Sequence, residues 1–219
     1  MVTLPFGDAA ALRHLRRDPV LKAVLTRIGP CTLEVATREP YEALIRSIAH
    51  QQVHGKAAAA VLGRFVALHP DQPFPTPDQV TVASFEALRG CGFSGSKITA
   101  IRDIAEKSAA GLVPTRSTAQ LLSDAELIER LVSLRGVGRW TVEMLLIFTL
   151  GRPDVLPVDD FGVREGWKQA AGLEAQPKPK ALAEIGLAWA PYRSTAAWYL
   201  WQVANAAKPI PRAKAGAAP

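Results

Sequence analysis

Cysteine is scarce in this sequence of 219 residues, which has only Cys31 and Cys91, far apart along the chain. Because the two form no CxxC pair, a cysteine-ligated zinc site and an iron–sulfur cluster are excluded. The sequence also lacks the dense cysteines of a disulfide-bonded secreted scaffold. We therefore expect a protein of a reducing compartment, the cytoplasm.

Long apolar runs and regular apolar–polar alternation are lacking too. No apolar run reaches the ~18 residues of a membrane-spanning helix, and the start, MVTLPFGDAA, lacks the charged-then-apolar order of a signal peptide. No segment has the period-2 pattern of a convincing β-strand. These absences predict a soluble protein without membrane association and without a sheet.

Helical periodicity is present almost throughout the sequence, enough for roughly ten helices. Apolar residues make up 48% of the chain, which allows a substantial core and suits one or two compact domains. We predict an all-α fold of two helical lobes with a central cleft over residues 1–207, followed by a basic, disordered tail over residues 208–219. The net charge of +6 favours an anionic partner.

Capping residues mark several helix starts. Asp8 and the pair Asp18-Pro19 are each placed to begin a helix, and Pro40 suits a first helical turn. The run SDAE at residues 123–126 matches a capping box. These signals predict helix starts just after each of them.

The stretch LRGVGRWTVEMLLIFTL predicts a helix-hairpin-helix, with helices over residues 124–134 and 139–150 and a turn over 135–138. Gly136 and Gly138 permit positive φ and a close approach by another backbone. Successive N–H groups there, together with the start of the second helix, form a favourable site for a phosphate. An ordinary turn between two helices is the alternative.

Other atoms of the hairpin extend this prediction. Arg139 adds a positive charge for a phosphate, and we expect Val137 and Thr141 to take part in the same contact. Hairpin carbonyl groups are also candidates for holding a monovalent cation, sodium or potassium, that bridges to the phosphate. The carbonyl groups expected to do so are those of Val132, Leu134 and Val137.

Two acidic residues follow the hairpin in the run LPVDD. An aspartate at the start of a helix is commonly an N-cap. At the mouth of a DNA-binding cleft it can instead stabilise positive charge that develops on a sugar, or position a water molecule. Both interpretations hold if Asp159 caps the helix and Asp160 faces the cleft.

Together the run LRGVGRWTVEMLLIFTLGRPDVLPVDDFGVREG resembles the core motif of the helix-hairpin-helix DNA glycosylases, and more narrowly the 3-methyladenine DNA glycosylase II branch. The runs IAHQQVHGKAAAAV and WAPYRSTAAWYLW resemble flanking motifs, so the likeness covers most of residues 40–205. It implies a monomer that binds duplex DNA, flips out an alkylated base and hydrolyses its N-glycosidic bond in base excision repair, with no cofactor for catalysis. Asp160 takes the catalytic position, with Asp159 as the alternative.

The resemblance also bears on mechanism. Bifunctional relatives carry a nucleophilic lysine where this chain has Trp140, so we predict a monofunctional enzyme that uses water and leaves the strand intact. Trp140 and Trp201 match pocket tryptophans of the branch, which attract an electron-poor base by stacking and cation–π interaction. Met144 stands where an aromatic pocket residue can occur. Core packing is the alternative for any single tryptophan.

The run HQQVH is polar within an apolar region. We expect Gln51 in the substrate pocket, Gln52 and His54 at the DNA, and Lys97 on a phosphate; a polar helix end and a solvated basic face are the alternatives. Gly95 falls where the family has a bulky wedge that fills the space left by the flipped base.

Because Gly95 has no side chain to insert, three alternatives are open. In the first, Phe93 fills the space left by the flipped base; in the second, another residue fills it; in the third, no wedge is needed because the enzyme favours lesions that are already weakly paired. For the whole protein, a non-catalytic helix-hairpin-helix DNA-binding module and a glycosylase for oxidised or mismatched bases stay open.

Overall fold

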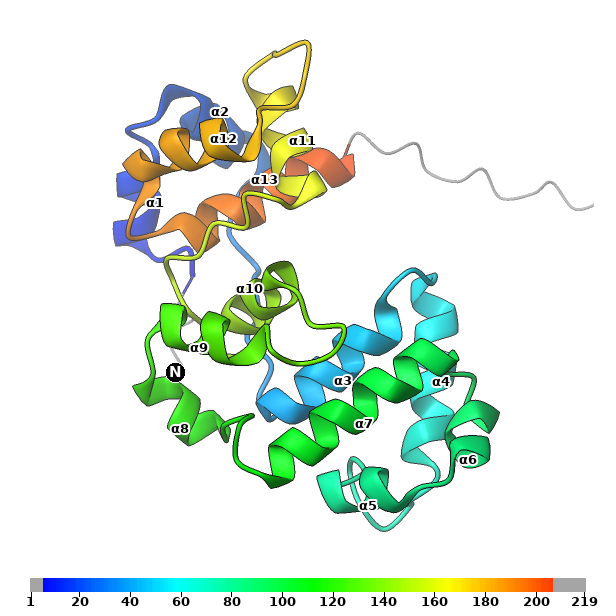
Figure 1. Ribbon diagram of the computed structural model, residues 1–219. Helices are drawn as coiled ribbons and strands as arrows, with labels where there is room; N and C mark the ends of the chain where they lie inside the picture. Colours follow the sequence, from blue (N-terminus) through cyan, green and yellow to red (C-terminus); the bar gives the residue numbers. More distant parts are fainter. Residues whose placement is uncertain (1–5, 207–219) are drawn as a thin grey trace, which may run out of the picture. The chain divides into compact units, whose positions relative to one another are not determined.

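The computed structural model describes residues 6–206, and these residues form helices with no β-strand among them (Figure 1). The expected all-α class is confirmed. The chain divides into two compact units, one made of Val35–Gly151 and the other of the two ends, up to Glu34 and from Arg152 onward. The cleft expected between two lobes stays a prediction, and the expected tail over 208–219 lies outside the described residues.

The unit of residues 35–151 is built around α7 (Gly95–Ala109), which packs against α3 (Pro40–His50) and α5 (Pro77–Val82) (Figure 1). On another side of α3 lies α10 (Arg139–Phe148), which also contacts α9 (Asp124–Leu131). The remaining helices of this unit are α4 (Gly55–Val66), α6 (Phe85–Gly90) and α8 (Arg116–Leu121).

Apolar faces turned inward give this unit its core. Among its fully buried side chains are Leu44, Ile45, Ile48, Phe65, Leu88, Phe93, Ile98 and Ile101. The rings of Phe65 and Phe93 meet edge to face with their centroids 5.4 Å apart. Burial of such side chains contributes about 1.5–3 kcal/mol each, which exceeds what helix propensity alone supplies.

The unit of the two chain ends contains α1 (Ala9–Leu15), α2 (Pro19–Ile28), α11 (Phe161–Ala170), α12 (Pro179–Ile185), the 3₁₀ turn η1 (Gly186–Trp189) and α13 (Arg193–Ala206). Among the hydrogen bonds that join the N-terminal helices to the rest of the unit, two come from buried aromatic side chains. The indole N–H of Trp189 donates to Asp18 Oδ2 at 2.9 Å, and the hydroxyl of Tyr199 donates to the carbonyl of Gly29 at 2.8 Å. Trp189 and Tyr199 are both fully buried.

Helix starts follow the capping signals of the sequence. Asp8 and Asp18 accept backbone hydrogen bonds at the starts of α1 and α2, and Pro40 is the first residue of α3. The capping box is complete, because Ser123 accepts from the N–H of Glu126 and the Glu126 carboxylate accepts from the N–H of Ser123 at 2.7 Å. These predictions are confirmed.

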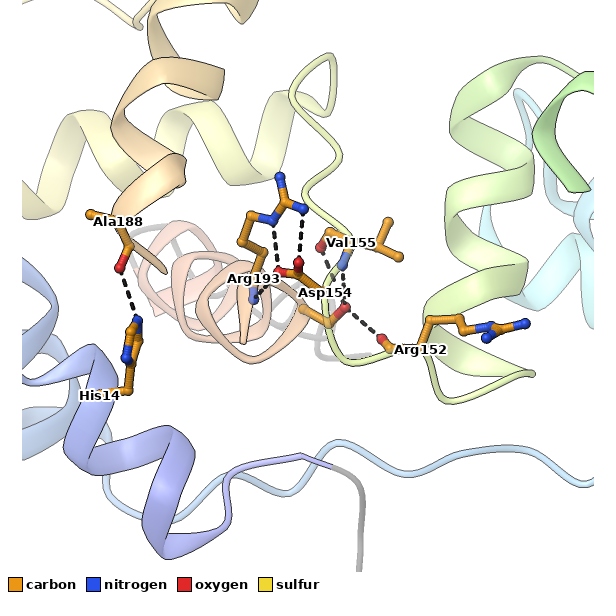
Figure 2. A network of polar contacts seen from close by, with 7 residues as sticks. His14, Arg152, Asp154, Val155, Ala188 and Arg193 are labelled. Carbon is orange, nitrogen blue, oxygen red and sulfur yellow. Dashed lines mark hydrogen bonds and ion pairs between the residues drawn. The ribbon is translucent and has the colours of Figure 1, made fainter. Parts of the chain in front are cut away.

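The segment that enters the second unit at Arg152 is fixed to the start of α13 (Figure 2). The buried hydroxyl of Ser194 donates to the carbonyl of Arg152 at 2.7 Å and accepts from the N–H of Val155 at 2.9 Å. Beside it, the guanidinium of Arg193 makes a two-pronged ion pair with Asp154, at 2.7 and 2.9 Å. The loop that leads to α11 therefore begins from a rigid point.

Close packing of α11 on α13 gives a first prediction. A Cβ added at Gly166 would overlap the carbonyl group of Leu200, which is backbone and cannot move aside. We expect Gly166→Ala to lower the free energy of unfolding by about 3 kcal/mol, measured by urea denaturation. The matched control is Gly63→Ala in α4, where nothing lies within 4 Å and alanine favours the helix. Equal stability of the two variants would contradict this packing.

Candidate active site and nucleic-acid interface

The hairpin between α9 and α10 is set by one tight contact. Gly136 has φ +72°, and a Cβ there would lie 3.3 Å from the side chains of both Ile48 and Ala100. Buried Leu134 and Val137 flank this point. The predicted positive φ at Gly136 is confirmed, and the glycine is needed both for its conformation and for the close approach.

Gly138 does not use the positive φ that a glycine permits. Its φ is −94° because it is the N-cap of α10, a position that takes extended backbone. Gly138 offers no side-chain oxygen, so the first N–H groups of α10 lack a cap from that residue.

Arg139 opens α10 with an exposed side chain, but its guanidinium is already paired. Its Nε donates to Oε1 of Glu143 at 2.9 Å, and the Glu143 carboxylate is buried. Sequence reasoning missed Glu143, although the i,i+4 spacing of the two residues is a recognised pairing signal. The pair holds the arginine head near the helix start rather than leaving it to move freely.

The turn between α3 and α4 is held at two points. The side-chain amide of Gln51 donates to the carbonyl of Gly136 at 2.9 Å, which joins this turn to the hairpin. The ammonium of Lys97 donates to the carbonyl of Ala49 at 2.8 Å, near the end of α3. Burial lowers the pKa of Lys97. Lys97 thus holds the end of α3 in this structure, where we expected it on a phosphate.

Directly after Gln51 comes Gln52, an exposed residue with φ +55°. Left-handed backbone is uncommon for residues other than glycine, and it is often found at binding sites. His54 is exposed and caps α4 by accepting from the N–H of Lys56 at 3.4 Å. His54 therefore lies at the start of a helix, in agreement with the interpretation of the run HQQVH as a polar helix end.

The structure reduces the number of residues that could fill the space left by a flipped base. Phe93 is fully buried against Phe65, so it cannot enter DNA without unpacking the core. Gly95, the first residue of α7, has no side chain to insert. At the α3–α4 turn, Gln52 has an exposed side chain that does not cap a helix, whereas the exposed His54 caps α4.

Two cavities lie beside α3 in the unit of residues 35–151. One of about 330 Å³ is lined by Ser47, His50, Gln51, Gln52 and Trp140, and Trp140 is 43% exposed. Another of about 390 Å³ is lined by Met144 and buried Thr141, among others, and shares Ser47 and His50 with the first. Three residues expected in the substrate pocket, Trp140, Gln51 and Met144, therefore line cavities. Thr141, which we expected at a phosphate, is buried and lines the cavity with Met144.

Asp160 and Trp201 meet in the other unit, although 41 residues separate them. Oδ1 of Asp160 accepts from the indole N–H of Trp201 at 2.8 Å and from the N–H of Val163 at 2.8 Å. Asp160 is thus the N-cap of α11, and Asp159 is exposed. Of the two candidate caps, Asp160 is the one that caps, because the cap geometry requires the residue directly before α11.

Gly162 makes the contact with Trp201 possible and was missed from the sequence. A Cβ there would lie 2.8 Å from Cδ1 of Trp201 and 3.1 Å from Oδ1 of Asp160. A larger residue would therefore push the indole off the carboxylate. The position of Gly162, two residues after Asp160, was the feature of the sequence that could have predicted this close contact.

Backbone carbonyl oxygens are the ligands that we expect to hold a cation at the hairpin. The carbonyl of Leu134 accepts from the N–H of Val137 at 3.2 Å, and a carbonyl oxygen keeps a second lone pair for a cation. Hard monovalent cations prefer oxygen, so the donor type fits. Val132 and Val137 lie on the same turn, and their role as ligands stays a prediction. The described residues hold no cluster of three or more histidine, cysteine, aspartate or glutamate residues suited to a metal ion.

Comparison with known proteins identifies the family of the chain. Residues 45–191 match the family model described as HhH-GPD superfamily base excision DNA repair protein. The chain belongs to the HhH-GPD superfamily. Within it, the chain is 46% identical over 176 residues to DNA-3-methyladenine glycosylase 1 of Schizosaccharomyces pombe, covering 79% of this chain and 77% of that protein.

Solved structures of the superfamily are also similar. The S. pombe 3-methyladenine DNA glycosylase Mag1, in complex with abasic DNA, aligns with a TM-score of 0.80 and 43% identity over 89% of this chain and 96% of that chain. A DNA-3-methyladenine glycosidase from Bacillus halodurans gives a TM-score of 0.82 with 34% identity, covering 91% of each chain. The predicted fold and the 3-methyladenine glycosylase branch are confirmed.

Gly136 and Gly138 supply a matched pair for a second prediction. Gly136→Ala meets both a positive φ and two contacts at 3.3 Å, so we expect it to lower the free energy of unfolding by about 2 kcal/mol. Gly138→Ala has open space and extended backbone, so its cost stays within about 1 kcal/mol. Urea unfolding measures both, and a larger loss for Gly138→Ala would contradict the structure of the hairpin.

Proposed function

We propose that this protein is a monofunctional DNA glycosylase, which flips alkylated bases of the 3-methyladenine type out of duplex DNA and hydrolyses their N-glycosidic bond to begin base excision repair. The observation that carries the proposal is the hydrogen bond of 2.8 Å from the Trp201 indole to Asp160 Oδ1. It joins an oriented carboxylate to an aromatic side chain. The names of the protein's relatives, which are 3-methyladenine DNA glycosylases, support the proposed glycosylase activity.

Asp160 takes the catalytic role in this proposal. Breaking an N-glycosidic bond leaves positive charge on the sugar, which a nearby carboxylate stabilises. Two donors on Oδ1, Val163 N–H and Trp201 Nε1, fix the plane of the carboxyl group. An alkylated purine is already a good leaving group, so the reaction needs little further acid catalysis.

Water is the nucleophile in this scheme. A lysine amine at the start of α10 would attack the sugar and lead to strand cleavage, but that position is Trp140, whose partly exposed ring borders a cavity. The aromatic ring instead attracts an electron-poor base, a contact that contributes about 1–2 kcal/mol when desolvated. This argues for base release without nicking.

DNA binding is assigned to the hairpin and the α3–α4 turn. First-turn N–H groups of α10 and the paired Arg139 suit a phosphate, a contact that positions the duplex without reading its sequence. The exposed, left-handed Gln52 is the residue we assign to the space left by the flipped base.

Among the described residues no helix has both the length and the apolar character to cross a membrane. We extend the proposal to a monomer that acts in the cytoplasm, on nucleoid DNA. A monovalent cation at the hairpin carbonyls is part of the same proposal.

Asp160→Asn tests the catalytic assignment. Asparagine keeps an oxygen for both donors but removes the charge, so we expect base release to fall at least about 100-fold while the melting temperature and DNA affinity change little. Asp159→Asn is the matched control, since Asp159 is exposed beside it. Full activity of Asp160→Asn with loss in Asp159→Asn would move the role to the neighbouring residue.

An assay of strand cleavage tests whether water is the nucleophile. We expect duplexes with 3-methyladenine or ethenoadenine to lose the base, with breaks appearing only after hot alkali, and duplexes with 8-oxoguanine or a mismatch to stay intact. Gel analysis with and without alkali measures this. Nicking without alkali would contradict the monofunctional mechanism, and DNA binding without release of any base would leave a non-catalytic binding module.

A further inference from the structure

Ser47 and His50 occupy an unusual place in the unit of residues 35–151. They lie three residues apart on α3, so both side chains share one face of the helix. Both line the cavity of about 330 Å³ that contains Trp140 and the cavity of about 390 Å³ that contains Met144. His50 begins the polar run HQQVH, but neither residue was assigned a role from the sequence.

Their polar groups have no partner within the described part of the chain, residues 6–206. Neither the Ser47 hydroxyl nor the His50 ring makes a hydrogen bond there, whereas the amide nitrogen of the neighbouring Gln51 is used on Gly136. A serine hydroxyl and an imidazole each offer a donor and an acceptor. Two uncommitted polar side chains beside an exposed tryptophan are suited to a ligand with an apolar face and a polar edge.

A purine base has this combination, and a cavity of about 330 Å³ lies within the roughly 300–1,000 Å³ range of small-ligand sites. If a base stacks on Trp140, its edge meets Ser47 and His50, because these share the cavity with the indole. Base-reading enzymes commonly recognise a flipped base by stacking together with hydrogen bonds to its edge.

We propose that Ser47 and His50 read the polar edge of the flipped base, with the His50 ring N–H donating to a ring-nitrogen acceptor such as the one ethenoadenine presents. The inference rests on the proposed glycosylase function. Ethenoadenine is neutral and a poorer leaving group than cationic 3-methyladenine, so its release depends more on contacts to the base. His50 thereby determines how far the enzyme acts on ethenoadenine.

Single-turnover release of ethenoadenine and of 3-methyladenine by His50→Leu and His50→Gln tests the proposal. Leucine has no donor, so we expect ethenoadenine release to fall on the order of tenfold, while 3-methyladenine release falls less than about threefold. Glutamine restores a donor and is expected to recover most of the loss. Ser47→Ala should shift the same ratio in the same direction.

His69→Leu is the matched control, since His69 lies outside both cavities and should leave the ratio unchanged. Affinity for a duplex with an abasic-site analogue, which has no base to read, should be the same for all variants, and melting temperatures report folding. Equal effects on both lesions, an unchanged ratio, or no recovery by glutamine would overturn the assignment of His50. Release of neither base by the wild-type protein would instead overturn the proposed function.

Discussion

The close approach of the hairpin backbone to α3 and α7 at Gly136 is the contact on which the hairpin and the α3–α4 turn of the unit of residues 35–151 depend. Only a glycine at φ +72° lets the chain pass Ile48 and Ala100 at this distance. That approach brings the Gly136 carbonyl within 2.9 Å of the Gln51 amide, so the hairpin and the α3–α4 turn become one rigid structure. The start of α10 and the exposed Gln52 are then fixed relative to each other.

A comparable arrangement governs the carboxylate in the other unit. Helix α13 holds the loop of residues 152–160 at both ends, through Ser194 and Arg193 at its first turn and through Trp201 two turns later. The loop delivers Asp160 as the cap of α11, and close packing at Gly166 sets the distance between α11 and α13. A catalytic carboxylate must be held in place before the reaction, because reorganisation during bond breaking would cost the stabilisation it provides.

The sequence predicted those features that local chemistry determines, and missed those that depend on packing. Capping signals need only neighbouring residues, so the helix starts marked by Asp8, Asp18, Pro40 and Ser123 were correct. Helix ends were less accurate: the helices predicted over 124–134 and 139–150 end at Leu131 and Phe148, and the described residues form thirteen α-helices where roughly ten were expected. The features that the sequence did not show concern tertiary contacts. Lys97 is drawn to the end of α3, Phe93 is needed in the core, Glu143 holds Arg139, and Gly162 makes room for an indole 39 positions further along the chain. The sequence left open whether Asp159 or Asp160 caps α11, because both residues are aspartate and their side-chain chemistry does not distinguish them.

The distribution of charge separates recognition of the base from the chemistry. The five side chains that line the cavity with Trp140 include no carboxylate, so that surface can attract a base only by stacking and hydrogen bonding. In the proposed function, the negative charge that bond breaking requires is assigned to Asp160, which belongs to the other unit of the chain. On that proposal, substitutions of Ser47 and His50 alter which base is released, whereas loss of the Asp160 charge removes the reaction for every base.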